Sequence, residues 1–250
     1  MPNYKKPPVR EAIIDIRVDR LPPTVLPELD HLHERLKTNY PSKKAAYAFE
    51  ARLEMQEAST ASSQKSHGII GYHFVSSDEK KIIQLKLDGF AFNRLKLDPN
   101  ESWSGWETLR EEAKTAWELY VDIAKPKEIT RLAVRYINQV VIRAVSIELD
   151  DYFTAPPHAP KDFRYQDLEN FFGRVAISIP DLNATAVITH APAPNPFPDS
   201  VTIILDIDIF RQQRMALDSL MIWETLDRFR ELKNNVFEAS LRQKARDLFL

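Results

Sequence analysis

Apolar and polar residues alternate along several segments of this chain, and that alternation constrains the fold more than any other feature. Between Val9 and Asp19, apolar residues take the even positions from 12 to 18, while Glu11, Asp15 and Arg17 take odd positions. Ala46 to Glu57 alternates in the same way. Because successive side chains of a β-strand point to opposite faces, both segments predict strands with one buried face and one polar face.

Further strands are predicted from similar patterns and from β-branched content. The Asp88-Gly89 pair is typical of a type I′ turn, so Phe90 to Leu97 should fold back on Lys81 to Leu87. The polar, Ser-rich stretch from Glu57 to His67 predicts a hairpin loop. The other predicted strands cover residues 68–76, 128–143, 174–179, 184–189 and 200–210.

Apolar residues spaced three or four apart predict amphipathic helices between these strands. One should run from about Thr24 to Tyr40, a second should follow a Ser102 cap, and a third should follow an Asp218 cap. Short helices are predicted at residues 148–153 and 165–172, and another helix over 238–250.

The order of these elements predicts an α+β fold. Strands joined by short turns pair antiparallel, and helices at the ends of such a run bury one face of the sheet. The chain therefore reads as two similar halves, residues 1–126 and 127–250, packed as one globular unit. Each half would be a curved, mostly antiparallel sheet on long helices, helix-grip-like, with the order β-α-β(3-4)-α.

Bulk composition excludes several classes of protein. A net charge of −2 makes nucleic acid an unlikely partner, because polyanion binding requires many uncompensated cations. The absence of cysteine excludes disulfides and thiolate chemistry. No stretch approaches the ~20 apolar residues that cross a bilayer, so the expected location is the cytoplasm, with no membrane partner.

Catalytic and cofactor motifs are weak. The five glycines lack the spacing of a phosphate-binding loop, and His31 and His33 lie two apart, not the four that a helical metal pair needs. No cofactor is therefore expected. Asp206 and Asp208 share one strand face, as do Glu50 and Glu54 around Arg52. The usual reason for such pairs is cross-strand ion pairing, while the alternative is a Mg²⁺ or Mn²⁺ site.

Basic and polar residues of the 128–143 strand are the main binding candidates. Arg131 and Arg135 should share one face, with Tyr136 and Asn138 on the opposite one. Arg17 would join these arginines if the strands are neighbours, opposite acids that include Asp15, Asp206 and Asp208. Such an acid-and-base lining resembles the interior of triphosphate-tunnel enzymes, for which Glu50-x-Arg52-x-Glu54 only approximates the usual Glu-x-Glu-x-Lys strand.

The aromatic-rich stretch from Lys86 to Trp106 is mainly structural by its periodicity. Phe90, Phe92 and Trp106 fall on predicted core faces. The residues left for recognition are Asn93, Arg94 and Trp103.

Several fragments, in order along nearly the whole chain, resemble a sporadically distributed family of bacterial and archaeal proteins of about this length. The matching fragments are 7–12 (PPVREA), 89–95 (GFAFNRL), the tryptophan helix 106–117, 131–138 (RLAVRYIN), 205–208 (LDID) and 233–238 (KNNVFE). The resemblance implies no activity, cofactor or catalytic residue. The patchy occurrence of that family is similar to that of mobile or defence-associated genes, which suggests a protein partner encoded nearby.

These observations together predict a binding module for a protein partner or a small polar ligand, with homo-oligomers an open alternative. The expected ligand-binding residues are Arg94, Arg131, Arg135, Tyr136 and Asn138. The enzyme alternative is a metal-dependent phosphohydrolase or nucleotidyl-transfer activity that uses Asp206 and Asp208. The sequence does not decide whether any reaction is catalysed.

Overall fold

The computed structural model describes residues 4–56, 59–98, 101–166 and 168–250, of which 48–56, 59–67 and 219 are described by their backbone alone. In this part of the chain nine strands form one antiparallel sheet in the order β2-β3-β4-β5-β1-β6-β9-β8-β7. The strands are β1 (Val9–Val18), β2 (Ser42–Gln56), β3 (Ser59–Val75), β4 (Lys81–Lys86), β5 (Gly89–Leu95), β6 (Ile129–Ile142), β7 (Gly173–Ile179), β8 (Ala184–Ala193) and β9 (Val201–Arg211). The predicted α+β class with an antiparallel sheet is confirmed.

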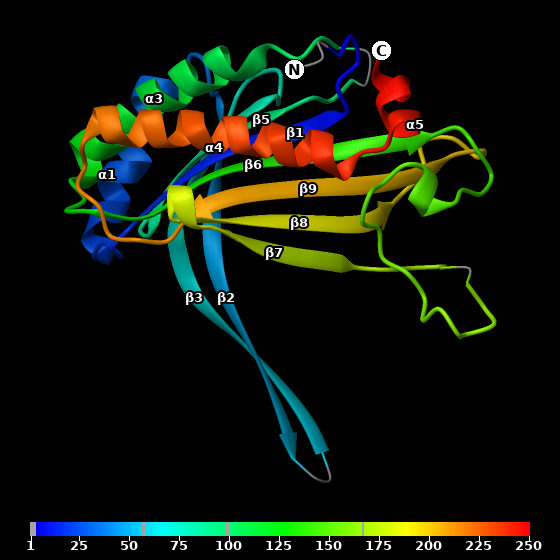
Figure 1. The fold of residues 1–250 in the computed structure, drawn as a ribbon. Helices are drawn as coiled ribbons and strands as arrows, with labels where there is room; N and C mark the ends of the chain where they lie inside the picture. The colour runs from blue at the N-terminus through cyan, green and yellow to red at the C-terminus, as the bar shows by residue number, and fades with distance from the viewer. Residues whose placement is uncertain (1–3, 57–58, 99–100, 167) are drawn as a thin grey trace.

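The helices lie on one side of the sheet, which we call the helix side, and leave the other side open (Figure 1). Two of them span 20 and 22 residues, α3 (Gly105–Ala124) and α4 (Ser219–Ser240). The others are short: α1 (Leu26–His31), α2 (His33–Leu36), α5 (Gln243–Arg246) and four 3₁₀ turns at 23–25, 149–151, 180–182 and 247–249. None of the helices in the described ranges has the length and apolar character needed to span a membrane.

The core lies between the sheet and the helices. β1 is the central strand of the sheet, and the alternation along it directs one set of its side chains into the core. Ala12, Ile14 and Ile16 are fully buried on the helix side. From α3, Trp117 and Tyr120 pack on Phe90 of β5, with ring centroids 5.7 and 6.3 Å away. Phe90, Phe92 and Trp106 are all buried, as their spacing predicts.

The predicted helix from Thr24 to Tyr40 is wrong as a single element. The chain forms a 3₁₀ turn and then α1 and α2, which are separated at Leu32. Pro27 lies in the first turn of α1, where a proline is tolerated because the N–H groups of that turn have no partner within the helix. Leu29 and Leu32 are still buried, so the apolar stripe is used although the helix is broken.

Three smaller predictions are also corrected. The Ser-rich stretch is not a loop from Ser59 onward, because β3 begins there and pairs with β2 in a hairpin that extends away from the body of the protein (Figure 1). Backbone ladder bonds need no apolar side chain, so polar composition did not prevent this strand. Residues 165–172, apart from 167, are irregular with bends at 169 and 170, and they do not form a helix. Helix α3 begins after Ser104, not after Ser102.

The hairpin between β4 and β5 forms as predicted, but its turn is shifted by one residue. Lys86 pairs with Gly89, so Leu87 and Asp88 are the turn residues. Asp88 is not among the residues with positive φ, as a type I′ turn would require, whereas Gly89 has a φ of 149°. A Cβ atom at Gly89 would lie 2.5 Å from the Ile16 carbonyl oxygen of β1.

We expect Gly89→Ala to lower the free energy of unfolding by about 3 kcal/mol, because it adds a backbone clash to an unfavourable φ. Gly68→Ala is the matched control: Gly68 also has a positive φ, of 79°, but a Cβ atom there would meet nothing within 4 Å. That control should cost only about 1 kcal/mol. Urea unfolding of both variants measures the difference, and equal losses would contradict the close approach of β5 to β1.

Candidate functional site

The residues predicted from the β6 pattern divide between the two sides of the sheet. Arg131 and Arg135 lie on the open side, while Tyr136 and Asn138 are buried on the helix side. The predicted opposition of these two pairs is confirmed. They therefore belong to two different candidate sites.

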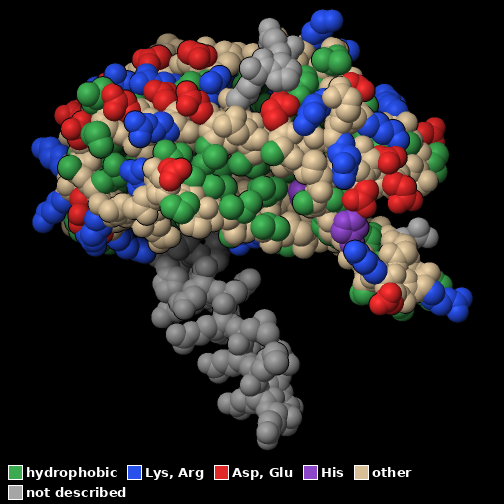
Figure 2. Space-filling view, viewed as in Figure 1, with side chains coloured by type: hydrophobic (Ala, Val, Ile, Leu, Met, Phe, Trp, Pro, Cys, Tyr) green, Lys and Arg blue, Asp and Glu red, His purple; other side chains and the backbone are tan. Residues whose placement is uncertain are grey.

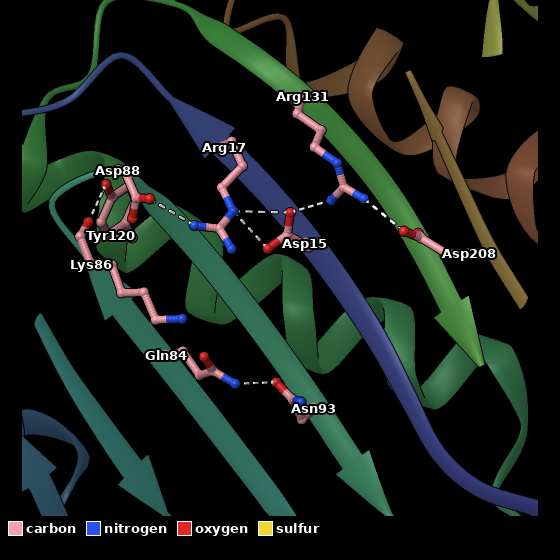
Figure 3. Close-up of polar contacts among 9 residues, drawn as sticks. All are labelled: Asp15, Arg17, Gln84, Lys86, Asp88, Asn93, Tyr120, Arg131 and Asp208. Carbon is pink, nitrogen blue, oxygen red and sulfur yellow. Dashed lines mark hydrogen bonds and ion pairs between the residues drawn. The ribbon is translucent and has the colours of Figure 1, made fainter. Parts of the chain in front are cut away.

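On the open side, the central strands carry a chain of ion pairs, which we call the open-face network (Figure 3). Arg131 of β6 donates to Asp15 of β1 at 2.6 Å and to Asp208 of β9 at 2.9 Å. Arg17 lies 2.9 Å from Asp15 and 2.8 Å from Asp88. One arginine thus ties three strands together, as expected if β1, β6 and β9 are neighbours.

A second part of the network lies beside the first. Arg135 donates two hydrogen bonds to Asp206, at 2.9 and 2.6 Å, in the bidentate geometry that planar guanidinium groups favour. The hydrogen bonds to Asp206 raise the pKa of Arg135. For Asp208 burial is the largest influence and raises its pKa, while Arg131 and Arg135 act in the opposite direction.

The open-face network borders a hollow of about 450 Å³. Ala91 and Ala133 flank Asp15 in register on β5 and β6, and their small side chains leave this space open. Gln84 donates to Asn93, and Asn93 donates to Glu11, so these two amides at the β4 end are also paired. The charges around the hollow therefore mainly neutralise one another.

The proposed metal pair was tested against this geometry. Asp206 is held by Arg135 and Asp208 by Arg131, so a divalent cation would have to displace an arginine from each carboxylate. Within the described ranges no three His, Asp or Glu side chains are grouped to hold a metal ion. The arrangement therefore favours ion pairs of Asp206 and Asp208 with these arginines over binding of a metal ion. The side chains of Glu50, Arg52 and Glu54 lie outside the described residues.

Arg94 does not join the other arginines. It lies opposite Ala12 in the β1–β5 register and so faces the helix side, where it pairs with Glu112 of α3 at 3.3 Å. Glu112 also accepts a bond from Lys81 at 2.6 Å. Arg94 therefore serves to attach α3 to β5, an interior strand of the sheet, and it does not line either of the two candidate sites.

On the helix side a pocket of about 470 Å³ lies between the N-terminal segment, the start of α3, β6 and α4; we call it the helix-side pocket. Tyr136 and Asn138 of β6 line it, together with Trp103. Trp103 is the aromatic residue that the periodicity did not assign to the core. Its ring meets Tyr136 edge-on, with centroids 6.3 Å apart.

Lys233 of α4 is the most unusual residue of this pocket. It is only 8% exposed, and its Nζ atom lies 3.8 Å from the centroid of the Tyr136 ring. Burial lowers the pKa of Lys233 to about 7; Arg230 acts in the same direction, and Glu238 opposes it. The ammonium group makes no hydrogen bond or ion pair with any described residue, and its cation–π contact with the Tyr136 ring offsets only part of the cost of burying the charge.

Three neighbours of Lys233 are also without a polar partner. Neither the Arg230 guanidinium, the Asn234 amide nor the Tyr136 hydroxyl forms a hydrogen bond or ion pair in the described part of the chain, and all three residues line the pocket. Glu238 differs, because it accepts a bond from Tyr4 at 3.0 Å and lies 3.4 Å from Arg246. Lys233 and these three neighbours thus present two cations and two neutral polar groups to the pocket.

The sequence analysis did not identify Lys233 as a site residue, although the apolar pattern of α4 contains a signal for it. The buried stripe of α4 runs through Ile222, Leu226 and Phe229 and reaches Phe237, with steps of four and three residues. Lys233 occupies the position four residues after Phe229, where the helical pattern requires an apolar residue. A charged residue at a core position of an amphipathic helix is the feature that could have identified this pocket.

Comparison with known proteins adds no assignment: no protein-family model, curated protein or solved structure matches the chain. The function must therefore be argued from the geometry of these two sites.

We expect Arg131→Met to lower the free energy of unfolding by about 2 kcal/mol, because it leaves the partly buried Asp208 carboxylate without its closest cation. Arg214→Met is the control, since Arg214 pairs with Asp19 and Glu128 but is 63% exposed. Its loss should stay below about 1 kcal/mol. Chemical denaturation of both variants tests this, and a smaller loss for Arg131→Met than for Arg214→Met would show that the network does not stabilise the sheet.

Proposed function

We propose that this chain is a binding module for a small organic anion held in the helix-side pocket. The observation that carries the proposal is the convergence of Arg230, Lys233, Asn234 and Tyr136 on one pocket without polar partners among the described residues. Buried polar groups without partners are costly, and a ligand that supplies acceptors removes that cost.

The charge of the pocket indicates the ligand class. Lys5, Arg230 and Lys233 contribute positive charge. Glu238, the only acidic side chain among the described lining residues, is already engaged by Tyr4 and Arg246. A carboxylate or another oxoanion would complement the surplus cations. The amide of Asn234 and the hydroxyl of Tyr136 can bond further oxygen atoms of the ligand.

The apolar part of the lining indicates the shape of the ligand. Trp103, Trp106 and Phe237 supply flat surfaces, and Pro7 and Pro8 close one side. A volume of about 470 Å³ falls in the ~300–1,000 Å³ range of small-molecule pockets. An organic acid with a flat apolar group therefore fits the lining better than a bare inorganic ion.

The open-face network supports ligand binding less well. Its arginines and aspartates bond one another at distances between 2.6 and 2.9 Å, so a ligand would have to replace existing ion pairs. Exchange of one satisfied partner for another gives little net free energy. The network is better explained as a device that holds β1, β6 and β9 together.

We expect benzoate, an aromatic carboxylate, to bind the wild-type protein and to change its tryptophan fluorescence, because Trp103 and Trp106 line the pocket. Lys233→Met should weaken binding at least about tenfold, which corresponds to about 1.4 kcal/mol. Binding should also weaken above about pH 7, because the cationic form of Lys233 is lost as pH rises through its pKa of about 7.

Lys37→Met is the control for charge removal, because Lys37 lies on the surface and pairs with Glu34 of α2. It should leave benzoate affinity unchanged. Undiminished binding by Lys233→Met, or the absence of any fluorescence change in the wild type at millimolar benzoate, would contradict the proposal.

A protein partner is the second candidate, and one surface favours it. β7 ends the sheet, and its Val175 and Ile177 face the helix side with 55% and 42% exposure. Hydrophobic side chains gather in this area below α4 (Figure 2). Exposed apolar edges of this kind pair with other strands. In an antiparallel pair of two β7 strands centred on Ala176, Val175 would lie opposite Ile177 of the second copy.

This second candidate predicts a dimer in light scattering of the wild type, and a monomer for Ile177→Glu because the charge would be buried in the apolar contact. Arg174→Glu changes charge on the other side of the same strand and serves as the control. A wild-type monomer at high protein concentration would remove this candidate.

We also propose that residues 1–126 and 127–250 are two versions of one helix-grip-like topology. In support, β1 is next to β5, the last strand of its half, and β6 is next to β9. α3 follows β5 and α4 follows β9. Superposition of β1 and β5 on β6 and β9 tests the idea. If α3 does not fall on α4 after this superposition, the two halves do not share one topology.

A further inference from the structure

Lys233 has the surroundings of a reactive amine as well as those of a charge partner. The residue is buried, with a relative exposure of only 8%, and it lines the helix-side pocket. Surface lysines such as Lys37 and Lys244 are instead held as cations in ion pairs. Lys233 has no such acceptor among the described residues to keep it protonated.

We propose that Lys233 captures a 2-oxo acid covalently, as an imine between its Nζ atom and the carbonyl carbon. This inference rests on the proposed function, because it assigns the carboxylate of that ligand to Arg230 and its carbonyl group to Lys233. It goes beyond non-covalent binding, since it assigns a covalent reaction to the pocket.

The position of Arg230 supports this assignment. Arg230 and Lys233 are three residues apart on α4 and so lie on the same face of the helix, and both line the pocket. A guanidinium group can hold a carboxylate with two parallel hydrogen bonds, which fixes the orientation of the neighbouring carbonyl group. In a 2-oxo acid the carboxylate and the carbonyl carbon are bonded directly, as two adjacent anchoring groups require.

Burial also supplies the reactive form of the amine. The lowered pKa of Lys233, about 7, leaves a large share of the side chain as the neutral amine near neutral pH. Only the neutral amine carries the lone pair that attacks a carbonyl carbon. The charged groups that face Lys233 are Arg230 and Glu238 of α4, with Lys5 of the N-terminal segment also in the lining.

The step balances without an oxidant or reductant. The Nζ lone pair forms a bond to the carbonyl carbon, and the carbonyl oxygen takes up a proton to give a carbinolamine. The carbon–oxygen bond then breaks, and the oxygen leaves as water with the two hydrogens that the amine has lost. The product is an imine, and hydrolysis reverses the step.

The test uses glyoxylate, the smallest 2-oxo acid, with the 250-residue chain at one fixed pH. Sodium borohydride reduces any imine to a stable secondary amine, and peptide mapping by mass spectrometry locates the carboxymethyl group. We expect labelling at Lys233 at least tenfold above that at Lys37 or Lys244. Propionaldehyde, which has a carbonyl group but no carboxylate, is the parallel probe.

Arg230→Met separates capture of the carboxylate from reactivity of the amine. This variant should lose at least tenfold in labelling by glyoxylate while labelling by propionaldehyde stays within twofold. Equal loss with both probes would overturn the role of Arg230 as the carboxylate partner. A thermal melt of the variant confirms that it remains folded.

Labelling spread evenly over the surface lysines would overturn the proposal. If benzoate binds the wild type but glyoxylate leaves Lys233 unlabelled, the imine is excluded and the binding function stands. If Lys233 is labelled but benzoate does not bind and Arg230→Met has no effect, the organic-anion function fails and only carbonyl capture remains.

Discussion

The antiparallel pairing of β1 with β6 is the contact on which the rest of the structure depends. It aligns Ile14 with Val134 on the helix side and Ile13 with Arg135 on the open side. Because side chains alternate along both strands, the residues between the register shifts at the two ends of this pair are assigned to a side once the register is set. A slip by one residue would bring Arg131 and Arg135 under the helices and expose the core.

The two sides of the sheet meet the cost of buried charge in different ways. On the open side, arginines and aspartates from neighbouring strands satisfy one another, so the ion pairs stabilise the register and need no ligand. On the helix side, Lys233 and Arg230 lie among aromatic rings without an acceptor among the described residues. Charge that a fold leaves uncompensated in a pocket is a sign of function. For this reason the pocket, and not the more conspicuous network, carries the functional argument.

Period-two alternation was sufficient to predict much of the sheet and the division of Arg131 and Arg135 from Tyr136 and Asn138. It could not predict the partner of Arg94. Alternation shows which residues of one strand share a face, but the partner of Arg94 is Glu112, which belongs to another element, α3. It also gave Lys233 no role, since a single lysine in a helix is usually exposed. The apolar stripe of α4 does pass through this position, and the packing of α4 in the structure shows that Lys233 is buried there.

The most direct test of the account is the pKa of Lys233 itself. Heteronuclear NMR of lysine side chains, with Lys233→Met to assign the signal, follows the protonation of each amine with pH. The account predicts a midpoint near 7 for Lys233 in the ligand-free protein. A midpoint near the ~10.4 of an ordinary lysine would contradict it, because such an amine would be hydrated or paired and the pocket would present no uncompensated charge.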